Sequence, residues 1–324
     1  MRLHGLAMIR NEADIVESFV RHHLGLLDGL SVIVHLPTDG TPQILDALRN
    51  EGLPLELLML NELGYNQGQR TTEAARSVFS RHRPDRLLLL DADEFVRVGS
   101  RAELEQALAT IPEGSQGLIP WHTYIPAEED DSEETEPVRR MRHRYPGVSS
   151  TDQYFKLVLG KAFAIEPSLV ICHGNHALAS PDSVKDRATR YHPLDGVLLA
   201  HYPVRSAEHI LSKVLVGWLS HIVIGDTVGR DAHWRELYER LRVSPTLDAG
   251  SVTALALKYA RHFNPAAQSE TVQLIDDPLP TNFDIKYAHL RLTEPLAHVV
   301  GFAERLAAEY HTLQQRARQR GLSV

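Results

Sequence analysis

Two kinds of hydrophobic pattern alternate along the first 90 residues. Short continuous apolar runs predict strands that are covered on both faces. These runs lie at residues 3–9, 31–36, 55–60 and 86–90. Between them, apolar residues at three- and four-residue spacing predict helices over residues 11–27, 43–50 and 67–81. Strand and helix in regular alternation indicate an α/β fold with a doubly wound, mostly parallel, Rossmann-like sheet.

The second half of the chain changes character near residue 205. Further strands are expected at residues 115–121, 154–163, 168–172 and 197–201. Helical spacing then dominates, over residues 206–222, 232–241, 252–262 and 294–320. We therefore expect an α/β domain over residues 1–204 and a helical region over residues 205–324 that packs on it.

Composition narrows the class of protein. The 324 residues carry a formal net charge of -8, which disfavours nucleic acid as a partner. A single cysteine, Cys172, cannot form an intramolecular disulfide and fits a reducing cytoplasm. No apolar run approaches the roughly 20 residues of a membrane helix, so we expect a soluble, cytoplasmic protein. Peripheral contact with the inner face of a membrane stays open, and the last helix could provide it or could pack on the body.

An acidic cluster follows the apolar run at residues 87–90. Asp91, Asp93 and Glu94 stand where ligands bind in open α/β sheets, outside the carboxyl end of a strand. Three carboxylates in four residues repel one another, and a divalent cation is the simplest compensation. Oxygen ligands suit Mn²⁺ or Mg²⁺, which commonly bridge one or two carboxylates to substrate phosphates. The alternative is a helix start, where acids complement the helix dipole.

Four motifs occur in a characteristic order. They are Asn11-Glu12, Thr38-Asp39-Gly40-Thr41, Leu90-Asp91-Ala92-Asp93-Glu94-Phe95, and His201-Tyr202-Pro203-Val204-Arg205-Ser206 followed by Lys213 and Gly217. With them, residues 1–220 resemble family 2-like glycosyltransferases of the GT-A fold, in the bacterial branch with an Asp-x-Asp-Glu-Phe motif. The resemblance implies a hexosyltransferase-type enzyme that depends on Mn²⁺ or Mg²⁺ and inverts the anomeric centre. It would move a sugar from a UDP- or GDP-sugar to a hydroxyl of a glycan, lipid-linked or small-molecule acceptor.

The resemblance also implies roles for individual residues. Asn11 and Glu12 would flank the nucleotide, and Asp39 would lie against the nucleoside. Asp91 would face the ribose or a metal-bound water, Asp93 would coordinate the metal, and His201 would be a late metal ligand. Arg205 and Lys213 would neutralise the diphosphate. His35 stands where family members usually carry Asp, so it could alter base recognition or be a hydrogen-bonded core residue.

The acceptor side is less defined by the sequence. Trp121, His122 and Tyr124 could form an acceptor platform or a buried aromatic cluster. His173 and His176 could touch a metal or sugar phosphates, whereas His22 and His23 are expected at the surface. A carboxylate must take the proton of the acceptor hydroxyl in an inverting reaction. Asp152 is the first candidate, and Glu128, in an acidic segment that otherwise reads as a solvated loop, is the second.

Two other functions remain open. The chain could be a non-catalytic module that binds nucleotide sugars, because His35 replaces the usual Asp and no base is evident. It could also be a sugar-phosphate nucleotidyltransferase. That chemistry usually comes with a glycine-rich, basic phosphate loop after the first strand, and residues 10–14 hold one arginine and no glycine.

Overall fold

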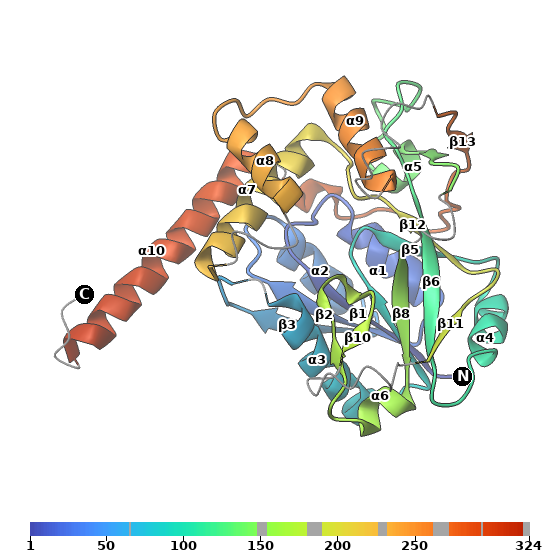
Figure 1. Cartoon of the computed structure of the whole chain (residues 1–324). Helices are drawn as coiled ribbons and strands as arrows, with labels where there is room; N and C mark the ends of the chain where they lie inside the picture. The colour runs from blue at the N-terminus through green and yellow to red at the C-terminus, as the bar shows by residue number, and fades with distance from the viewer. Residues whose placement is uncertain are drawn as a thin grey trace.

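A computed structural model describes residues 1–64, 66–147, 154–179, 190–225, 232–261, 272–292 and 294–319. It shows an α/β body, three helices packed at one end of it, and a long last helix that projects away (Figure 1). The predicted α/β class with a helical C-terminal region is confirmed. In the described part of the chain, no helix is both long and apolar enough to span a bilayer.

Nine strands of the described residues form one sheet, in the order β3-β2-β1-β4-β8-β6-β12-β5, with β11 also paired to β6. They are β1 (Leu3–Ile9), β2 (Gly29–His35), β3 (Leu55–Leu60), β4 (Arg86–Leu90), β5 (Glu94–Arg97), β6 (Gln116–Thr123), β8 (Phe155–Gly160), β11 (Tyr191–Pro193) and β12 (Leu198–His201). β8 is antiparallel to β4 and to β6, and β5 is antiparallel to β12; the other pairs are parallel. Two small ladders join β7 (His143–Arg144) to β13 (Ile275–Asp276) and β9 (Val170–Ile171) to β10 (Leu178–Ala179).

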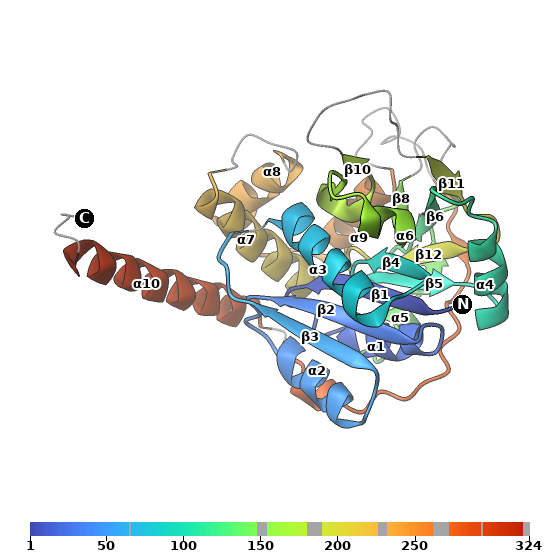
Figure 2. The same ribbon diagram turned by 90° about the horizontal axis from the view of Figure 1, so that it is seen from below.

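Helices cover both faces of the sheet, as expected of a doubly wound fold (Figure 2). Along β4, Leu88 and Leu90 enter the core beneath α1 and α2, whereas Leu87 and Leu89 enter the core beneath α3. This alternation follows from the two-residue period of a strand. The helices are α1 (Val16–Leu24), α2 (Thr41–Asn50), α3 (Gln67–His82), α4 (Arg101–Ala109), α5 (Pro137–Arg140), α6 (Lys161–Ile165), α7 (Ala207–Val223), α8 (Ala232–Leu241), α9 (Ala249–Ala260) and α10 (Pro295–Gln319), with 3₁₀ turns η1 (His173–Asn175) and η3 (Ala288–Leu290).

Two local predictions need correction. The expected strand over 154–163 ends at Gly160, where α6 begins, because the Gly160 amide turns to donate to the Gln116 side chain at 2.9 Å. His22 and His23 are not a surface pair. His23 is wholly buried where α1 packs on β5, and its ring contacts the Val96 N–H. The His22 ring nitrogen Nε2 donates to the Val96 carbonyl at 2.7 Å.

The C-terminal part returns to the body before α10 begins. β13 pairs with β7, and the backbone N–H groups of Lys286 and Tyr287 each donate to Glu17 on α1 at 2.9 Å. Residues 286–290 therefore pack on the α/β body rather than among the C-terminal helices. The predicted domain division after residue 204 stays a prediction.

Candidate functional site

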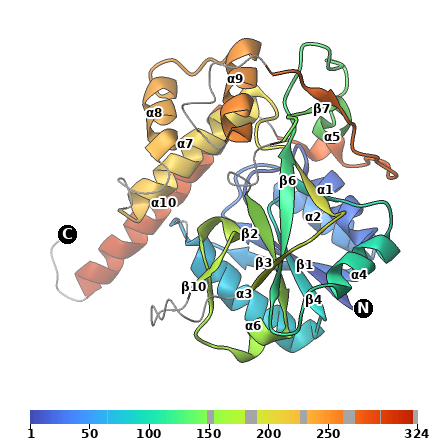
Figure 3. The ribbon, with the colours of Figure 1, turned by 45° about the vertical axis from the view of Figure 1, so that its right-hand side comes forward.

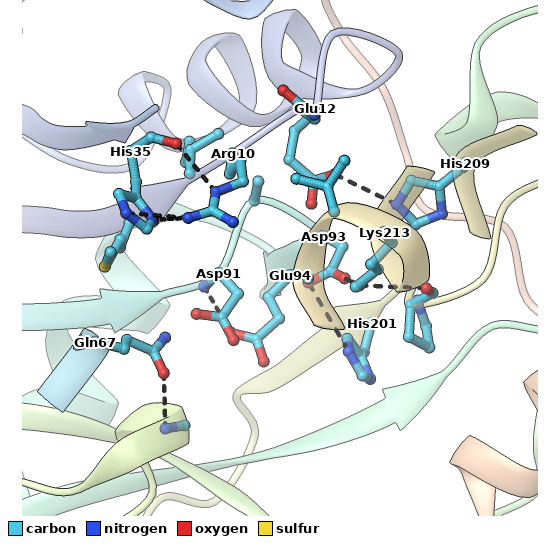
Figure 4. Close-up of a pocket in the computed structure, with 18 of the residues that line it drawn as sticks. Arg10, Glu12, His35, Gln67, Asp91, Asp93, Glu94, His201, His209 and Lys213 are labelled. Carbon is cyan, nitrogen blue, oxygen red and sulfur yellow. Dashed lines mark hydrogen bonds and ion pairs between the residues drawn. The ribbon is translucent and has the colours of Figure 1, made fainter. Parts of the chain in front are cut away.

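A pocket of about 540 Å³ opens where the carboxyl ends of β1 and β4 meet α7 and η1. Figure 4 shows Asp91, Asp93 and Glu94 close together, with His201 and Lys213 next to Asp93. The position agrees with the expectation for an open α/β sheet. Ten residues predicted for the site line it, namely Asn11, Glu12, His35, Asp91, Asp93, Trp121, His173, His176, His201 and Lys213.

The acidic segment links two strands. β4 ends at Leu90 and β5 starts at Glu94, and α4 begins only at Arg101. The Asp91 N–H donates to the Glu94 carboxylate at 2.9 Å, which closes the turn between the strands. The helix-start alternative is therefore wrong, and the carboxylates stand on the backbone of the sheet.

Asp93 is 5% exposed and is surrounded by cationic side chains. Its Oδ2 accepts a hydrogen bond from Lys213 Nζ at 3.0 Å and lies 3.9 Å from Arg205 Nη1. Burial alone would raise the pKa of Asp93, but Lys213, His201 and Arg205 outweigh it and hold that pKa well below its usual range. Asp93 thus presents a fixed negative charge to the pocket.

His201 presents a neutral imidazole beside Asp93. Burial lowers its pKa to about 4, against the opposing attraction of Asp93. Its ring stacks on Trp121 with centroids 4.6 Å apart, and its Nε2 lies 3.9 Å from Asp93 Oδ1. In the described part of the chain, His201 Nδ1 makes no hydrogen bond. An uncharged imidazole at this place has the state that metal coordination requires.

The predicted metal ligands Asp91, Asp93 and His201 do not form one cluster. Among the described residues, no three His, Cys, Asp or Glu side chains come together as a metal site. Asp91 is instead paired with Lys156. Asp93 and His201 alone face each other, and two protein ligands suffice for Mn²⁺ or Mg²⁺ where substrate phosphates supply others. The residues therefore fit a divalent cation held jointly with a ligand.

Lys156 supports the pocket from outside its lining, through Asp91, and was not among the residues predicted from the sequence. It lies on β8, wholly buried, and its Nζ donates to Asp91 Oδ2 and to the Gly174 carbonyl at 2.8 Å, with Glu94 Oε1 3.4 Å away. Burial lowers the pKa of the lysine, but Asp91 and Glu94 outweigh it and raise that pKa above its ordinary value. The signal was present as one lysine within the apolar strand over 155–159.

Glu94, which is buried, and Glu12, which is mostly buried, are two further carboxyls of the pocket lining. Burial raises the pKa of Glu94 well above its ordinary value, although Lys156 opposes this. Burial likewise raises the pKa of Glu12 to about 7, against the attraction of Arg205 and Lys213. Both carboxyls are therefore easier to protonate than Asp93.

Arg205 supports the pocket from behind and does not line it. Its guanidinium is wholly buried and pairs with Glu12 and with Asp14, at 2.7 Å from Nε to the Asp14 carboxylate. It also donates to the Tyr202 carbonyl at 3.1 Å. Of the two cations predicted to meet the diphosphate, the structure brings only Lys213 to the pocket wall.

Asp39 also lies outside the pocket lining. Its two oxygens accept from the Thr41 and Ala13 N–H groups at 2.9 and 3.0 Å, which ties the loop after β2 to the loop after β1. The next residue is covered by the C-terminal segment, since a Cβ on Gly40 would lie 1.9 Å from the Leu290 carbonyl oxygen. Asp39 thus holds these two loops together, and its predicted contact with a nucleoside stays a prediction.

His35 is part of a hydrogen-bonded pair with Arg10. The Arg10 guanidinium donates to His35 Nδ1 at 2.6 Å, and His35 Nε2 donates to the Glu62 carbonyl at 2.8 Å. Burial, followed by the Arg10 charge, lowers the pKa of His35 to about 3. Arg10 itself lines the pocket and reaches Ser220 on α7 at 2.5 Å. The hydrogen bonds agree with the expectation of a hydrogen-bonded residue and show that His35 positions Arg10. Because His35 also lines the pocket, its part in base recognition stays a prediction.

Aromatic rings form another part of the pocket wall. Trp121 stacks on Tyr154 at 5.6 Å between centroids, and His176 meets Trp121 edge-on at 5.2 Å. Because His176 Nδ1 lies 2.8 Å from the Phe155 carbonyl, Nδ1 carries the proton. Burial lowers the pKa of His176 to about 4.

The remaining acceptor-side predictions fall elsewhere. His122 does not line the pocket, because neighbours along a strand point to opposite faces and Trp121 takes the pocket side. Tyr124 is wholly buried in the core. Glu128 is exposed and does not line the pocket either, while Asp152 lies outside the described residues.

Comparison with known proteins gives distant structural matches. No protein-family model matches the chain. No curated protein matches it in sequence. TarS 1-349 from S. aureus is 15% identical, with a TM-score of 0.36 and coverage of 83% of this chain and 82% of that one. The mannosyltransferase PcManGT from Pyrobaculum calidifontis, in complex with GDP-Man and Mn2+, is 13% identical, with a TM-score of 0.37 and coverage of 83% and 88%. HddC from Yersinia pseudotuberculosis is 9% identical, with a TM-score of 0.32 and coverage of 59% and 88%.

Proposed function

We propose that this protein is a glycosyltransferase that takes its sugar from a nucleoside diphosphate sugar. The observation that carries the proposal is the pairing of Asp93 with Lys213 and His201 in one pocket at the carboxyl edge of the sheet. A fixed carboxylate, a neutral imidazole and a lysine suit a diphosphate and the cation that accompanies it.

The donor end of the pocket combines cations from separate elements. Lys213 from α7 and Arg10 from the end of β1 both line it. Positive groups aimed at a leaving diphosphate stabilise the charge that develops as the glycosidic bond to phosphate breaks. Asp93 and His201 would hold Mn²⁺ or Mg²⁺, which would neutralise further charge on the phosphates. Lys156 keeps Asp91 oriented, so the turn between β4 and β5 holds its shape when the ligand binds.

The acceptor end is assigned to the aromatic wall of Trp121, Tyr154 and His176. Aromatic rings offer a flat apolar face with polar edges, which suits the apolar face of a sugar ring. Asp152 remains our proposal for the carboxylate that takes the proton of the acceptor hydroxyl. It precedes Tyr154, a residue of this wall, by two positions in the sequence. Inversion of the anomeric centre belongs to the same proposal.

The test measures binding first and chemistry second. Thermal shifts are recorded with UDP and GDP, each with and without MnCl₂, for the wild type, Asp93→Asn and the control Glu128→Gln. We expect stabilisation of the wild type and the control by a nucleoside diphosphate with Mn²⁺, and its loss in Asp93→Asn. Circular dichroism confirms that each variant is folded.

Donor chemistry then separates the alternatives. Release of nucleoside diphosphate from a UDP- or GDP-sugar, by hydrolysis or transfer, supports the proposal. Binding without turnover across a broad acceptor panel would instead show a non-catalytic module. Release of pyrophosphate from a nucleoside triphosphate and a sugar phosphate would show a nucleotidyltransferase. The absence of stabilisation by any nucleoside diphosphate would overturn the site assignment itself.

A further inference from the structure

The last helix leaves the body after its first two turns. His298 of α10 bonds Ser212 on α7 at 2.6 Å, and Phe302 is wholly buried in a cluster with Leu36 and Val216. From residue 303 to residue 311 every side chain is exposed. Figures 1 and 2 show this part of α10 projecting from the molecule. An isolated helix of about 15 residues is marginal in water, so the projecting part needs packing from elsewhere.

The projecting part carries an apolar stripe with a regular period. Leu306, Tyr310 and Leu313 are 42%, 55% and 50% exposed. With Ala303 and Ala317 they follow one another at alternating spacings of three and four residues. This is the heptad spacing by which two helices bury a shared seam. The spacing of the stripe therefore suits packing against another helix.

Charge on the flank of the stripe selects the orientation of that helix. Glu309 and Arg316 occupy the same flanking heptad position, one heptad apart. In an antiparallel pair of identical helices, equivalent flanking positions face each other across the seam, so Glu309 meets the partner's Arg316 and the reverse. In a parallel pair Glu309 would meet the partner's Gln314, without a charge partner. The charge pattern thus fits an antiparallel copy of the same helix.

We propose that α10 pairs with α10 of a second copy of this chain, antiparallel about a two-fold axis. The register places Tyr310 against the partner's Leu313 and Leu306 against the partner's Ala317. Such a contact is self-complementary and closes at two subunits. It would leave the pocket accessible, since the pairing part of α10 lies beyond the residues that pack on α7.

The end of α7 extends the same surface. Ser212 bonds His298 and Val216 packs with Phe302, so the two helices run side by side in the same direction (Figure 3). The last residues of α7 and the one that follows, Ile222, Val223 and Ile224, are exposed beside the point where α10 leaves the body. In the antiparallel pair the end of the partner helix comes to this place and covers them. The added area matters because a stable dimer buries on the order of 1,200 Å² or more.

A membrane surface fits these observations less well. Helices that lie on membranes carry Lys and Arg on the polar face. Here the projecting part carries both signs of charge, with Glu304 and Glu309 among its arginines, and the whole chain has a net charge of -8, which disfavours anionic lipid. A second copy satisfies both the stripe and the mixed charges.

The first test changes the seam. Sedimentation equilibrium of the wild type at about 10 µM is expected to show a dimer, as an interface of this class allows. Leu306→Gln with Leu313→Gln should give a monomer with the same thermal midpoint, because glutamine keeps helix propensity and neither side chain packs on the body. The matched control is Ala308→Gln on the opposite side of α10, which should remain dimeric. A wild-type monomer, or a double glutamine variant that stays dimeric, would overturn the proposal.

The second test changes only the charges. Either Glu309→Arg or Arg316→Glu alone puts like charges at positions 309 and 316, which face each other across the seam. The two-fold axis repeats this contact, so each variant should weaken the dimer about tenfold. The combined variant restores opposite charges and should recover wild-type affinity. Failure of the combined variant to recover would exclude the antiparallel register. Flotation of a monomeric wild type with anionic phosphatidylglycerol vesicles would assign α10 to a membrane and overturn the dimer.

Discussion

Lys213 Nζ lies 3.0 Å from Asp93 Oδ2, and the two residues come from different elements that line the pocket. Lys213 belongs to α7, whereas Asp93 stands in the turn between β4 and β5. The pair therefore joins the C-terminal helices to the sheet at the place where we propose the diphosphate binds. The Lys213 cation offsets the charge of the Asp93 carboxylate.

Lys213→Met should weaken binding of a nucleoside diphosphate by about 10- to 100-fold, the worth of one charged hydrogen bond. The variant removes a cation from the pocket and leaves Asp93 with less compensation. Isothermal titration with GDP and UDP in Mn²⁺ measures the change. Lys161→Met, an exposed lysine outside the pocket, is the control. Equal affinities for wild type and Lys213→Met would remove Lys213 from the donor site.

Lys156→Met should lower the free energy of unfolding by about 3–5 kcal/mol, because it leaves buried carboxylates without their cation. Urea denaturation at neutral pH measures this loss. Lys156→Met combined with Asp91→Asn removes one of the charges that the lysine compensates, so part of the stability should return. A single variant as stable as the wild type would show that Asp91 and Glu94 are compensated by other groups.

The stability of the protein should fall in acid because of His23. Its Nδ1–H donates to the Phe19 carbonyl at 2.8 Å and its Nε2 accepts from the Val96 N–H at 3.3 Å, so the buried ring has no place for a second proton. Burial, together with the neighbouring His22, lowers its pKa well below 6.5. The unfolded chain therefore binds a proton more readily, and this stability is present above pH 6.5 and lost as the pH falls below it.

Unfolding curves between pH 7.5 and 5 measure that loss. His23→Gln should be less stable at neutral pH, yet its stability should depend on pH less steeply, by up to about 1.4 kcal/mol per pH unit below 6.5. His311→Gln, at an exposed position on α10, should keep the slope of the wild type. An unchanged slope in His23→Gln would contradict the buried neutral state.

Gly40→Ala should destabilise the protein by about 1–3 kcal/mol through overpacking. The added Cβ would meet the Leu290 carbonyl oxygen at 1.9 Å, so the segment around η3 must move off the loop after β2. Limited proteolysis should then cut this segment faster than in the wild type. Gly250→Ala is the control, because its nearest neighbour lies at an ordinary 3.7 Å. Equal cleavage rates would show that the segment adapts without leaving the body.

The sequence predicted those features that depend on neighbours along the chain. The apolar runs marked β1 to β4, and Glu12 and Asp93 stand among the polar residues after β1 and β4. His201 and Lys213, which also line the pocket, were predicted from the family resemblance. Features that depend on distant pairing were missed. Lys156 reaches Asp91 only because β8 inserts antiparallel between β4 and β6, and no local pattern announces that order.

Three residues lie elsewhere than the sequence predicted, also because of contacts with distant segments. Asp39 and Arg205 stand in the expected motifs, but each is bound by backbone or carboxylate groups from another segment. His23 was expected at the surface, and β5 is the element that buries it. In each case a contact far away in the chain decides where the side chain points.

Ser212 and Lys213 are neighbours on α7 with different partners. Ser212 bonds His298 at the base of α10, and Lys213 bonds Asp93 in the pocket. One turn of helix is thus anchored to the last helix on one side and to the floor of the pocket on the other. The surface that we propose for the dimer and the pocket that we propose for the donor are therefore connected through two adjacent residues of α7.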